Sequence, residues 1–359
     1  MKRVRRAVGF VAVVLLLNVL FYYTLTDRGY RKVWSLAFSL CTQSCTLSDG
    51  DYSEYALLDR AASKYSLFLW ETQRGAPLNA DGLEDMLYYL AGKTDLRCLV
   101  TDLSYAAADC LNRFLDGEEE AFTQFSDACP ESEWATSAHR GLLVRLREYN
   151  DRMPERRRIR LIGIGGGSCR EMTVRYLQEL CANVGNRRKS SETAALLDAV
   201  LNEGDCRGLW EAFREDSAPF HELFGGSFYA FRTALEDSAA PTDDRDGRLA
   251  YMAGRLCDEI ARDSGGKYLG FIGEDGFIDA LADFDPSVGG KMYRGRALYD
   301  ATADGDSRFG LAESGLYETD NRFFRYFEAW RQIVCRLNRL DDASYARKDD
   351  PELLLIFVS

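Results

Sequence analysis

With 359 residues the chain is long enough for one large domain or two small ones, and no Pro/Gly/Ser-rich linker divides it. Its 57 acidic and 45 basic residues give a net charge of −12, and its longest basic run is Arg156–Arg158. This balance argues against nucleic acid as a partner.

The amino-terminal residues differ in kind from the rest. A basic segment, Lys2–Arg6, precedes an apolar stretch, Ala7–Leu25, which is about long enough to cross a membrane as a helix and is interrupted by Asn18. We therefore predict a signal-anchor over residues 1–27 that holds the protein in the cell membrane by a single span. A cleaved signal peptide is the alternative, but no small-x-small site ends the stretch. Because the basic residues precede the span, we expect the C-terminal domain to be extracytoplasmic.

Residues 28–54 are expected to be a membrane-proximal segment with a short helix over Arg31–Cys45. Cys41 and Cys45 form a local CxxxC pair with no second Cys or His cluster nearby. This favours a disulfide or two free thiols over a zinc site. Three other cysteines fall in apolar runs or on apolar helix faces and are expected to be small buried hydrophobes: Cys98, Cys181 and Cys257.

Four short apolar runs each end at a small or acidic residue that starts a loop, and each is followed by a stretch with helical spacing. These runs are Tyr65–Trp70, Arg97–Thr101, Ile159–Ile164 and Tyr268–Ile272. Strands that alternate with helices are typical of a parallel sheet, whose carboxyl ends meet at one edge. We therefore predict an α/β fold over residues 55–359, with a mostly parallel central sheet flanked by helices on both faces.

Helical spacing of apolar residues accounts for much of the remaining chain. The expected helices are Tyr55–Ser63, Asp81–Gly92, Tyr105–Phe125, Trp134–Tyr149, Met172–Leu180, Arg248–Asp263 and Asn321–Leu337, and Leu353–Val358 is expected to be a last strand. Strand signals vanish between about residues 186 and 245, where we predict a helical cap inserted into the domain. Its aromatic residues, expected to form one face, are Phe220, Phe224, Phe228, Tyr229 and Phe231.

Carboxylates follow the predicted strands. Glu71 and Asp102 come at the ends of the first two, where the sheet would fix the backbone and aim the side chain into a polar crevice, so both are candidate catalytic residues. Glu274 and Asp275 repeat the pattern after the fourth run and are candidate ligand-binding residues. The alternative is that each carboxylate caps a helix or pairs with an arginine. Such a group also suits a hard cation such as Ca²⁺ or Mg²⁺.

A glycine-rich turn, Gly163–Ser168, joins the third strand to its helix. Backbone amides at a helix start can hold an anion, but Ser168 stands where the dinucleotide-binding pattern needs a third glycine. Ser168 and Glu171 have the spacing of a capping box, which we favour. The remaining candidate ligand-binding residues flank the strand ends: Gln73, Arg74, Ser168 and Arg170.

The stretches Tyr65–Phe122, Tyr149–Leu180 and Arg248–Gly273 together resemble the erythromycin esterase/ChaN-like superfamily, over roughly Tyr55–Tyr299. The resemblance implies an α/β sheet with helices on both faces and a site at the strand ends. It also implies that Glu71 matches the motif glutamate of that family and that Asp102 is the acidic residue of its second strand.

The motif histidines of that family are missing from this chain. Gln73 stands at one such position, Ser168 and Asp275 stand near two others, and Gly165 replaces an aspartate. In that family a histidine is implied as the base that activates water, and glutamine cannot accept a proton at neutral pH. The two histidines of the chain, His139 and His221, lie away from these loops, and we expect both to be structural.

We therefore predict a membrane-anchored extracytoplasmic domain on a degenerate hydrolase scaffold that binds a ligand or partner. The alternative is an active, esterase-like hydrolase in which Glu71 or Asp102 is the general base, its pKa raised by neighbouring like charges. A third hypothesis is haem or metal binding, since ChaN-like relatives imply haem binding and the chain is rich in tyrosine.

Overall fold

The computed structural model describes residues 44–46, 58–72, 80–184, 190–263, 265–299, 315–318 and 353–357. The chain forms two compact units, one of residues 62–293 and one that joins residues 1–61 with 294–359. The predicted anchor, Gln73, Arg74 and the helix over Asn321–Leu337 lie outside the described residues. Among the helices of the described part, none combines the length and apolar character that a bilayer crossing needs.

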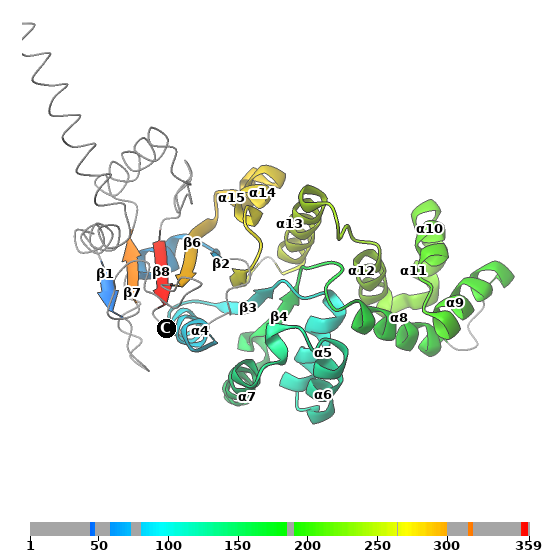
Figure 1. Cartoon of the computed structure of the whole chain (residues 1–359), viewed down its shortest axis with the longest axis horizontal. Coiled ribbons are helices and arrows are strands. Elements are labelled where there is room, and N and C mark those ends of the chain that lie inside the picture. Colours follow the sequence, from blue (N-terminus) through cyan, green and yellow to red (C-terminus); the bar gives the residue numbers. More distant parts are fainter. Residues whose placement is uncertain are drawn as a thin grey trace, which may run out of the picture. The chain divides into compact units, whose positions relative to one another are not determined.

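Four parallel strands form the sheet of the larger unit. Their order is β2 (Leu67–Thr72), β5 (Lys267–Ile272), β3 (Leu96–Thr101) and β4 (Arg160–Gly163) (Figure 1). All four match predicted apolar runs, which are apolar at most positions because both faces of the strands are covered. Glu71 pairs with Ile272 and Val100 with Gly270, so the carboxyl ends meet at one edge. The predicted α/β fold with a parallel sheet is confirmed for this unit.

Helices cover this sheet (Figure 1). On one face, Val100 and Ile272 of the sheet join Leu256 of α13 (Arg245–Arg262) and Leu281 of α14 (Phe277–Phe284) in one buried cluster. Helix α5 (Tyr105–Leu115) packs against β4, and α4 (Ala80–Lys93) packs against β3. The other helices of this layer and its connections are α6 (Glu119–Ala128), η2 (Glu133–Ala135), α7 (Ser137–Arg152), η3 (Glu155–Arg157), α8 (Arg170–Val184) and α15 (Pro286–Gly289). Helix α3 (Asp59–Lys64) begins in the smaller unit and ends in the larger one.

One predicted helical stretch is broken in two. Tyr105–Phe125 contains α5 and α6, which are separated at Gly117. Gly117 has a φ of +104°. Residues with a Cβ rarely adopt this backbone conformation, and it ends a helix. At the start of α5 the Ser104 hydroxyl oxygen accepts a hydrogen bond from the Ala107 amide, which fixes the loop just after β3.

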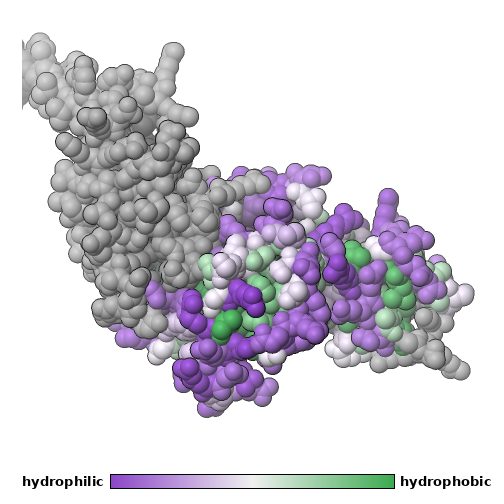
Figure 2. Space-filling model, turned by 60° about the horizontal axis from the view of Figure 1, so that its bottom comes forward, coloured by the Kyte–Doolittle hydropathy of each residue, from purple (hydrophilic) through white to green (hydrophobic). Residues whose placement is uncertain are grey.

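The residues between α8 and α13 fold as a group of helices that share one buried core with α8. They are α9 (Ser191–Glu203), α10 (Arg207–Glu215), α11 (Ala218–Phe224), η4 (Gly225–Ser227) and α12 (Phe228–Ser238). The predicted aromatic face is turned inward: the Phe224 and Phe231 rings stack with centroids 3.7 Å apart, and Phe220 is buried beside them. Figure 2 shows green apolar residues between purple hydrophilic ones over these helices and over the part of the unit that carries the sheet.

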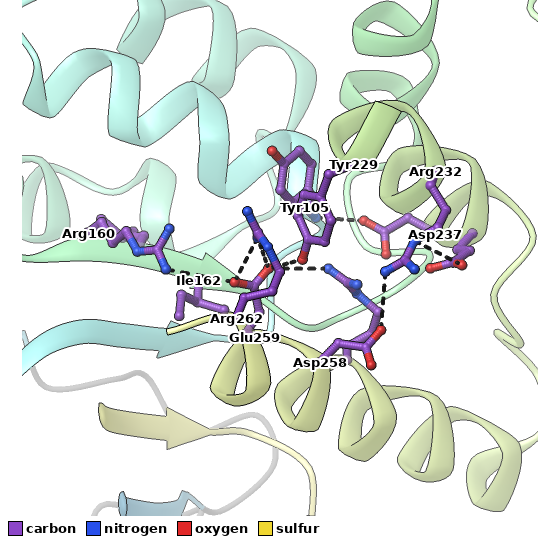
Figure 3. A network of polar contacts seen from close by, with 12 residues as sticks. Tyr105, Arg160, Ile162, Tyr229, Arg232, Asp237, Asp258, Glu259 and Arg262 are labelled. Atoms are coloured by element: carbon purple, nitrogen blue, oxygen red, sulfur yellow. Dashed lines mark hydrogen bonds and ion pairs between the residues drawn. The ribbon is translucent and has the colours of Figure 1, made fainter. Parts of the chain in front are cut away.

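A buried polar network ties these helices to α13 (Figure 3). The Glu259 carboxylate, whose side chain is 4% exposed, accepts a hydrogen bond from the Tyr229 hydroxyl of α12. The same carboxylate lies 3.7 Å from Arg255 Nη2 and 3.3 Å from Arg262 Nη1. Arg255 is also buried, and its guanidinium nitrogens make no hydrogen bond among the described residues. Glu259 therefore supplies the opposite charge for the buried guanidinium of Arg255.

Asp237, at the end of α12, forms a second polar contact in the same region (Figure 3). Its carboxylate accepts hydrogen bonds from the Tyr105 amide at 2.6 Å and from the Tyr251 hydroxyl at 2.5 Å. Burial raises the pKa of Asp237 above its usual range, while the Tyr251 hydrogen bond opposes that rise. These contacts fasten α12 to the start of α5 and to α13.

Three described strands belong to the smaller unit: β1 (Ser44–Thr46), β7 (Gly315–Glu318) and β8 (Leu353–Phe357). A fourth, β6 (Met292–Tyr299), has its first two residues in the larger unit and the rest in the smaller one. β6 pairs with β8 in parallel, whereas β7 pairs with both β8 and β1 in antiparallel fashion. The predicted last strand is confirmed as β8. The helix predicted over Arg31–Cys45 is wrong at its end, because Ser44 and Cys45 pair with β7 as a strand.

Candidate functional site

A cavity of about 450 Å³ lies at the carboxyl ends of β2, β3 and β5 in the larger unit. A segment between α6 and α7 and the turn before α8 complete its walls. The lining residues are Thr72, Asp102, Leu103, Ala128, Cys129, Pro130, Glu131, Ser132, Glu133, Trp134, Ser168, Cys169, Phe271 and Gly273. The predicted crevice at the strand ends is therefore present as a cavity.

Among the carboxylates that follow the strands, Asp102 is the one that lines this cavity. It follows β3, and a Cβ placed on Gly273 would lie 3.6 Å from both Asp102 Oδ2 and Thr72 Oγ1, so three strand ends meet there. Burial, together with the negative charges of Glu133 and Glu274, raises the pKa of Asp102 to about 6. A carboxyl with this pKa takes up and releases a proton near neutral pH.

The glycine-rich turn positions the backbone of Asp102. A Cβ on Gly165 would lie 1.7 Å from the Asp102 carbonyl oxygen, and one on Gly163 would lie 2.3 Å from the Ser104 carbonyl oxygen. The Ser168 hydroxyl donates hydrogen bonds to the carbonyl oxygens of Asp102 at 3.0 Å and of Gly165 at 2.8 Å. The glycines are thus explained by the close approach of two backbone segments, with no need for a bound nucleotide.

The capping box predicted from Ser168 and Glu171 is wrong. α8 begins at Arg170, so Cys169, and not Ser168, precedes its first residue. Ser168 directs its hydroxyl to the carbonyl oxygens described above, and the Glu171 carboxylate pairs with Arg175 at 2.5 Å. Ser168 is nevertheless in the cavity wall, where it holds the loop of Asp102.

Replacement of Gly165 tests this positioning. The Cβ of Gly165→Ala would overlap the Asp102 carbonyl, so we expect a shift of one backbone segment and a loss of about 2 kcal/mol in the free energy of unfolding. The control is Gly92→Ala in α4, where a Cβ meets nothing within 4 Å and the helix should gain up to about 1 kcal/mol. Urea denaturation followed by tryptophan fluorescence measures both. Equal stability of the two variants would contradict the close approach.

Glu71 does not line the cavity. Its Oε1 accepts hydrogen bonds from the amides of Gly276 at 3.1 Å and Ile278 at 3.0 Å, at the start of α14. Successive side chains of a strand point to opposite faces, and it is the next residue, Thr72, that lines the cavity. Glu71 therefore caps α14, as in the alternative stated for the strand-end carboxylates.

Glu274 and Asp275 also bond to arginines of α13. The Glu274 carboxylate lies 3.2 Å from Arg248 Nε, and the Asp275 carbonyl accepts a hydrogen bond from Arg245. Neither residue lines the cavity, although the charge of Glu274 reaches Asp102. Arg170 is exposed at the start of α8. Burial raises the pKa of Cys206, and the charge of Arg170 opposes that rise. Of the described candidates, the cavity thus brings together Asp102 and Ser168.

The two histidines are placed as structural residues. His139 is 2% exposed, bonds through Nδ1 to the Thr136 hydroxyl at 2.9 Å, and packs on Trp134 with ring centroids 5.1 Å apart. Burial lowers the pKa of His139 to about 4. His221 is exposed and packs on Phe228. Neither histidine lines the cavity, so no imidazole of this chain faces Asp102 there.

The sequence did not indicate the opposite wall of the cavity. Cys129, Trp134 and the acidic residues between them follow α6, far from any predicted strand end. A usable signal is the composition of Cys129–Trp134, in which two carboxylates and a tryptophan interrupt the helical pattern. Within the described residues, no group of three or more His, Cys, Asp and Glu side chains is placed to hold a metal ion.

No protein-family model and no curated protein matches the chain. Solved structures similar to it include a Bacillus cereus protein, with 12% identity, 91% of this chain and 97% of that chain covered, and a TM-score of 0.61. A mutant of the erythromycin esterase EreC in its open conformation has 12% identity, 78% and 90% coverage, and a TM-score of 0.50. A succinoglycan biosynthesis protein has 10% identity, 76% coverage of each chain, and a TM-score of 0.56. The chain is therefore similar in fold to these proteins, and the fold implied by the sequence resemblance is supported at the level of a distant likeness.

Proposed function

We propose that the cavity at the strand ends binds a small organic molecule that carries both a positive charge and an apolar group. The observation that carries this proposal is the lining: it includes the carboxylates of Asp102, Glu131 and Glu133, and no lysine or arginine is among the described lining residues. The aromatic residues Trp134 and Phe271 also line the cavity. Carboxylates attract a cation directly, and aromatic rings bind one through their negatively charged faces.

The contacts of Asp102 explain why an organic cation fits this cavity better than a neutral molecule. Its pKa is raised because the surroundings supply negative charge and little water. A bound cation would supply the missing opposite charge and would favour ionised Asp102. Binding of the cation and release of the Asp102 proton are therefore linked, and affinity should rise with pH.

Benzyltrimethylammonium is a suitable probe because its charge does not change with pH. We expect its affinity to rise roughly tenfold between pH 5 and pH 7.5, as the Asp102 carboxyl loses its proton. Benzyl alcohol, the uncharged control, should bind more weakly and with no such dependence. Isothermal titration calorimetry measures both. Equal binding of the two probes at pH 7.5 would contradict the proposal.

A matched pair of variants assigns the effect to Asp102. Asp102→Asn should abolish the pH dependence and weaken binding of benzyltrimethylammonium about tenfold at pH 7.5. Asp95→Asn removes a carboxylate of the same kind just before β3, at the other end of that strand, and should leave binding unchanged. Loss of binding in both variants would point to net charge and away from a defined site.

Hydrolysis is the second candidate function, favoured by two observations. The pKa of Asp102 lies near 6, a suitable value for a general base at neutral pH, and the fold is similar to that of an erythromycin esterase. A panel of aryl esters and lactones tests it: turnover that rises with pH around 6 and disappears in Asp102→Asn would support hydrolysis. Glu71→Gln should then affect stability more than turnover, because Glu71 caps α14. No turnover, combined with cation binding, would support a binding protein on a degenerate hydrolase scaffold.

We further propose that residues 1–27 anchor the protein in the cell membrane with the larger unit outside the cytoplasm. The support is the basic segment followed by an apolar stretch in the sequence. Protease added to intact cells should trim the protein, and alkaline carbonate should leave its amino-terminal part in the membrane fraction. Full protection from protease, or release by carbonate, would contradict the proposal.

A further inference from the structure

Two cysteines from separate segments of the chain meet in the cavity wall. Cys129 directly follows α6, Cys169 directly precedes α8, and both line the cavity. Cys129 is 4% exposed and Cys169 is half-buried. Hydrogen bonding to the Cys169 thiol, together with burial, holds the pKa of the Cys129 thiol well above its usual range. Cys129 and Cys169 therefore line the same cavity as free thiols, and they lie close enough to influence each other's titration.

The other described thiols are engaged differently. Cys110 donates a hydrogen bond to the Ala121 carbonyl at 3.1 Å, and Cys206 donates to the Gly204 carbonyl at 3.7 Å. Cys98 and Cys181 are buried within the hydrophobic clusters, and Cys257 packs against one of these clusters. Cys129 and Cys169 therefore stand apart as the two described thiols that line the cavity, and they interact with each other there.

Cys169 also belongs to the turn that positions Asp102. Its φ of 53° places it in the left-handed region, directly after Ser168, whose hydroxyl holds the Asp102 carbonyl. A bond formed at the Cys169 sulfur would therefore act on the same turn that fixes Asp102. It would also join the end of α6 to the start of α8 across the wall of the cavity.

We propose that Cys129 and Cys169 are a redox-active dithiol that closes reversibly to a disulfide at the cavity. The oxidant is a low-molecular-weight disulfide such as oxidised glutathione. The Cys169 thiolate, which is the more exposed of the two, attacks one glutathione sulfur, the glutathione disulfide breaks, and one glutathione thiolate leaves. The Cys129 thiolate then attacks the Cys169 sulfur and displaces the second glutathione.

The reaction is balanced. Two protein thiols are oxidised to one disulfide, and one glutathione disulfide is reduced to two glutathione thiols, which take up the two protons that Cys129 and Cys169 release. This inference goes beyond the proposed cation binding and does not depend on it, because disulfide formation needs only the two thiols and the oxidant.

Tryptic mapping of the full chain tests the proposal. Trypsin is expected to release Cys129 within Phe114–Arg140 and Cys169 within Leu161–Arg170, and each peptide contains one cysteine. After incubation with oxidised glutathione and alkylation of the remaining thiols, we expect these two peptides as one linked species, two hydrogen atoms lighter than their sum. As the ratio of reduced to oxidised glutathione is raised, both peptides should reappear together in their alkylated form.

A second reagent detects Cys129 and Cys169 in their reduced form. Phenylarsine oxide binds two neighbouring thiols at once, so it should protect Cys129 and Cys169 together from alkylation. In Cys169→Ser, both the linked peptide and the arsenical protection should disappear. Cys181→Ser, which changes a buried thiol in the core of the helical part, should retain both, and circular dichroism checks that each variant is folded.

Two results would overturn the proposal. One is recovery of both cysteines as alkylated peptides from folded wild-type protein at every glutathione ratio. The other is glutathione attached to Cys169 while Cys129 stays alkylatable, because this shows that the second exchange step does not occur.

Discussion

Glu259→Gln is expected to lower the free energy of unfolding by about 3–5 kcal/mol. The Glu259 side chain is 4% exposed, and its carboxylate is the ion-pair partner of Arg255, whose side chain is 3% exposed. The neutral amide leaves the Arg255 guanidinium buried without an opposite charge at this position. It also replaces the acceptor of the Tyr229 hydroxyl bond, which fastens α12 to α13.

Chemical denaturation at pH 7, followed by circular dichroism, measures this loss. The control is Glu118→Gln, which removes a carboxylate whose side chain is 44% exposed and which pairs with Arg113 at the surface. We expect a much smaller loss of stability from that change, because water screens an exposed ion pair. Similar losses in the two variants would contradict a special role for the buried pair.

A double variant separates two contributions to the loss of stability: the missing ion pair, and the burial of the Arg255 charge without a partner. Adding Arg255→Met to Glu259→Gln removes the buried charge and fills its volume with an apolar side chain. We expect it to recover part of the lost stability. No recovery would show that the contacts of Glu259 with Tyr229, Arg262 and Arg160 account for the whole effect.

The strands of the larger unit could be predicted from the sequence because burial on both faces leaves a local signature. β2, β3, β4 and β5 are short apolar runs followed by loops, and each was predicted within two residues at either end. Their order could not be predicted. β5 lies between β2 and β3, although almost all of the unit precedes it in the chain, and that pairing depends on contacts that no local pattern encodes.

The residues of the candidate site could also be predicted only in part. Asp102 and Ser168 were predicted together, and the structure places both in one wall. Glu71 was predicted beside them, yet its neighbour Thr72 lines the cavity, since a change of one position in a strand reverses the face that a side chain occupies. The wall that contains Cys129 could not be predicted, because only tertiary packing brings the end of α6 to these strand ends.

Asp102→Asn is expected to change how stability depends on pH. The pKa of Asp102 is about 6 in the folded protein and 3.8 in the reference state, so the folded state holds the proton more tightly. The contribution of Asp102 to stability is therefore complete below pH 3.8 and is lost as the pH rises through 6. The loss corresponds to roughly 1–3 kcal/mol, at about 1.4 kcal/mol for each pKa unit. An asparagine has no such proton, so the variant should be more stable than the wild type at pH 7 and should lose that advantage at pH 4.

Asp95→Asn is the control with the opposite sign. The hydrogen bond from Arg97 lowers the pKa of Asp95, so its contribution is present above the unfolded pKa and is lost as the pH falls. We expect that variant to be less stable than the wild type at pH 7 and equal to it at low pH. Urea denaturation at intervals from pH 3.5 to pH 8 measures all three proteins. If the curves of Asp102→Asn and the wild type run parallel, Asp102 has an ordinary pKa, and both the general-base and the linked cation-binding proposals lose their basis.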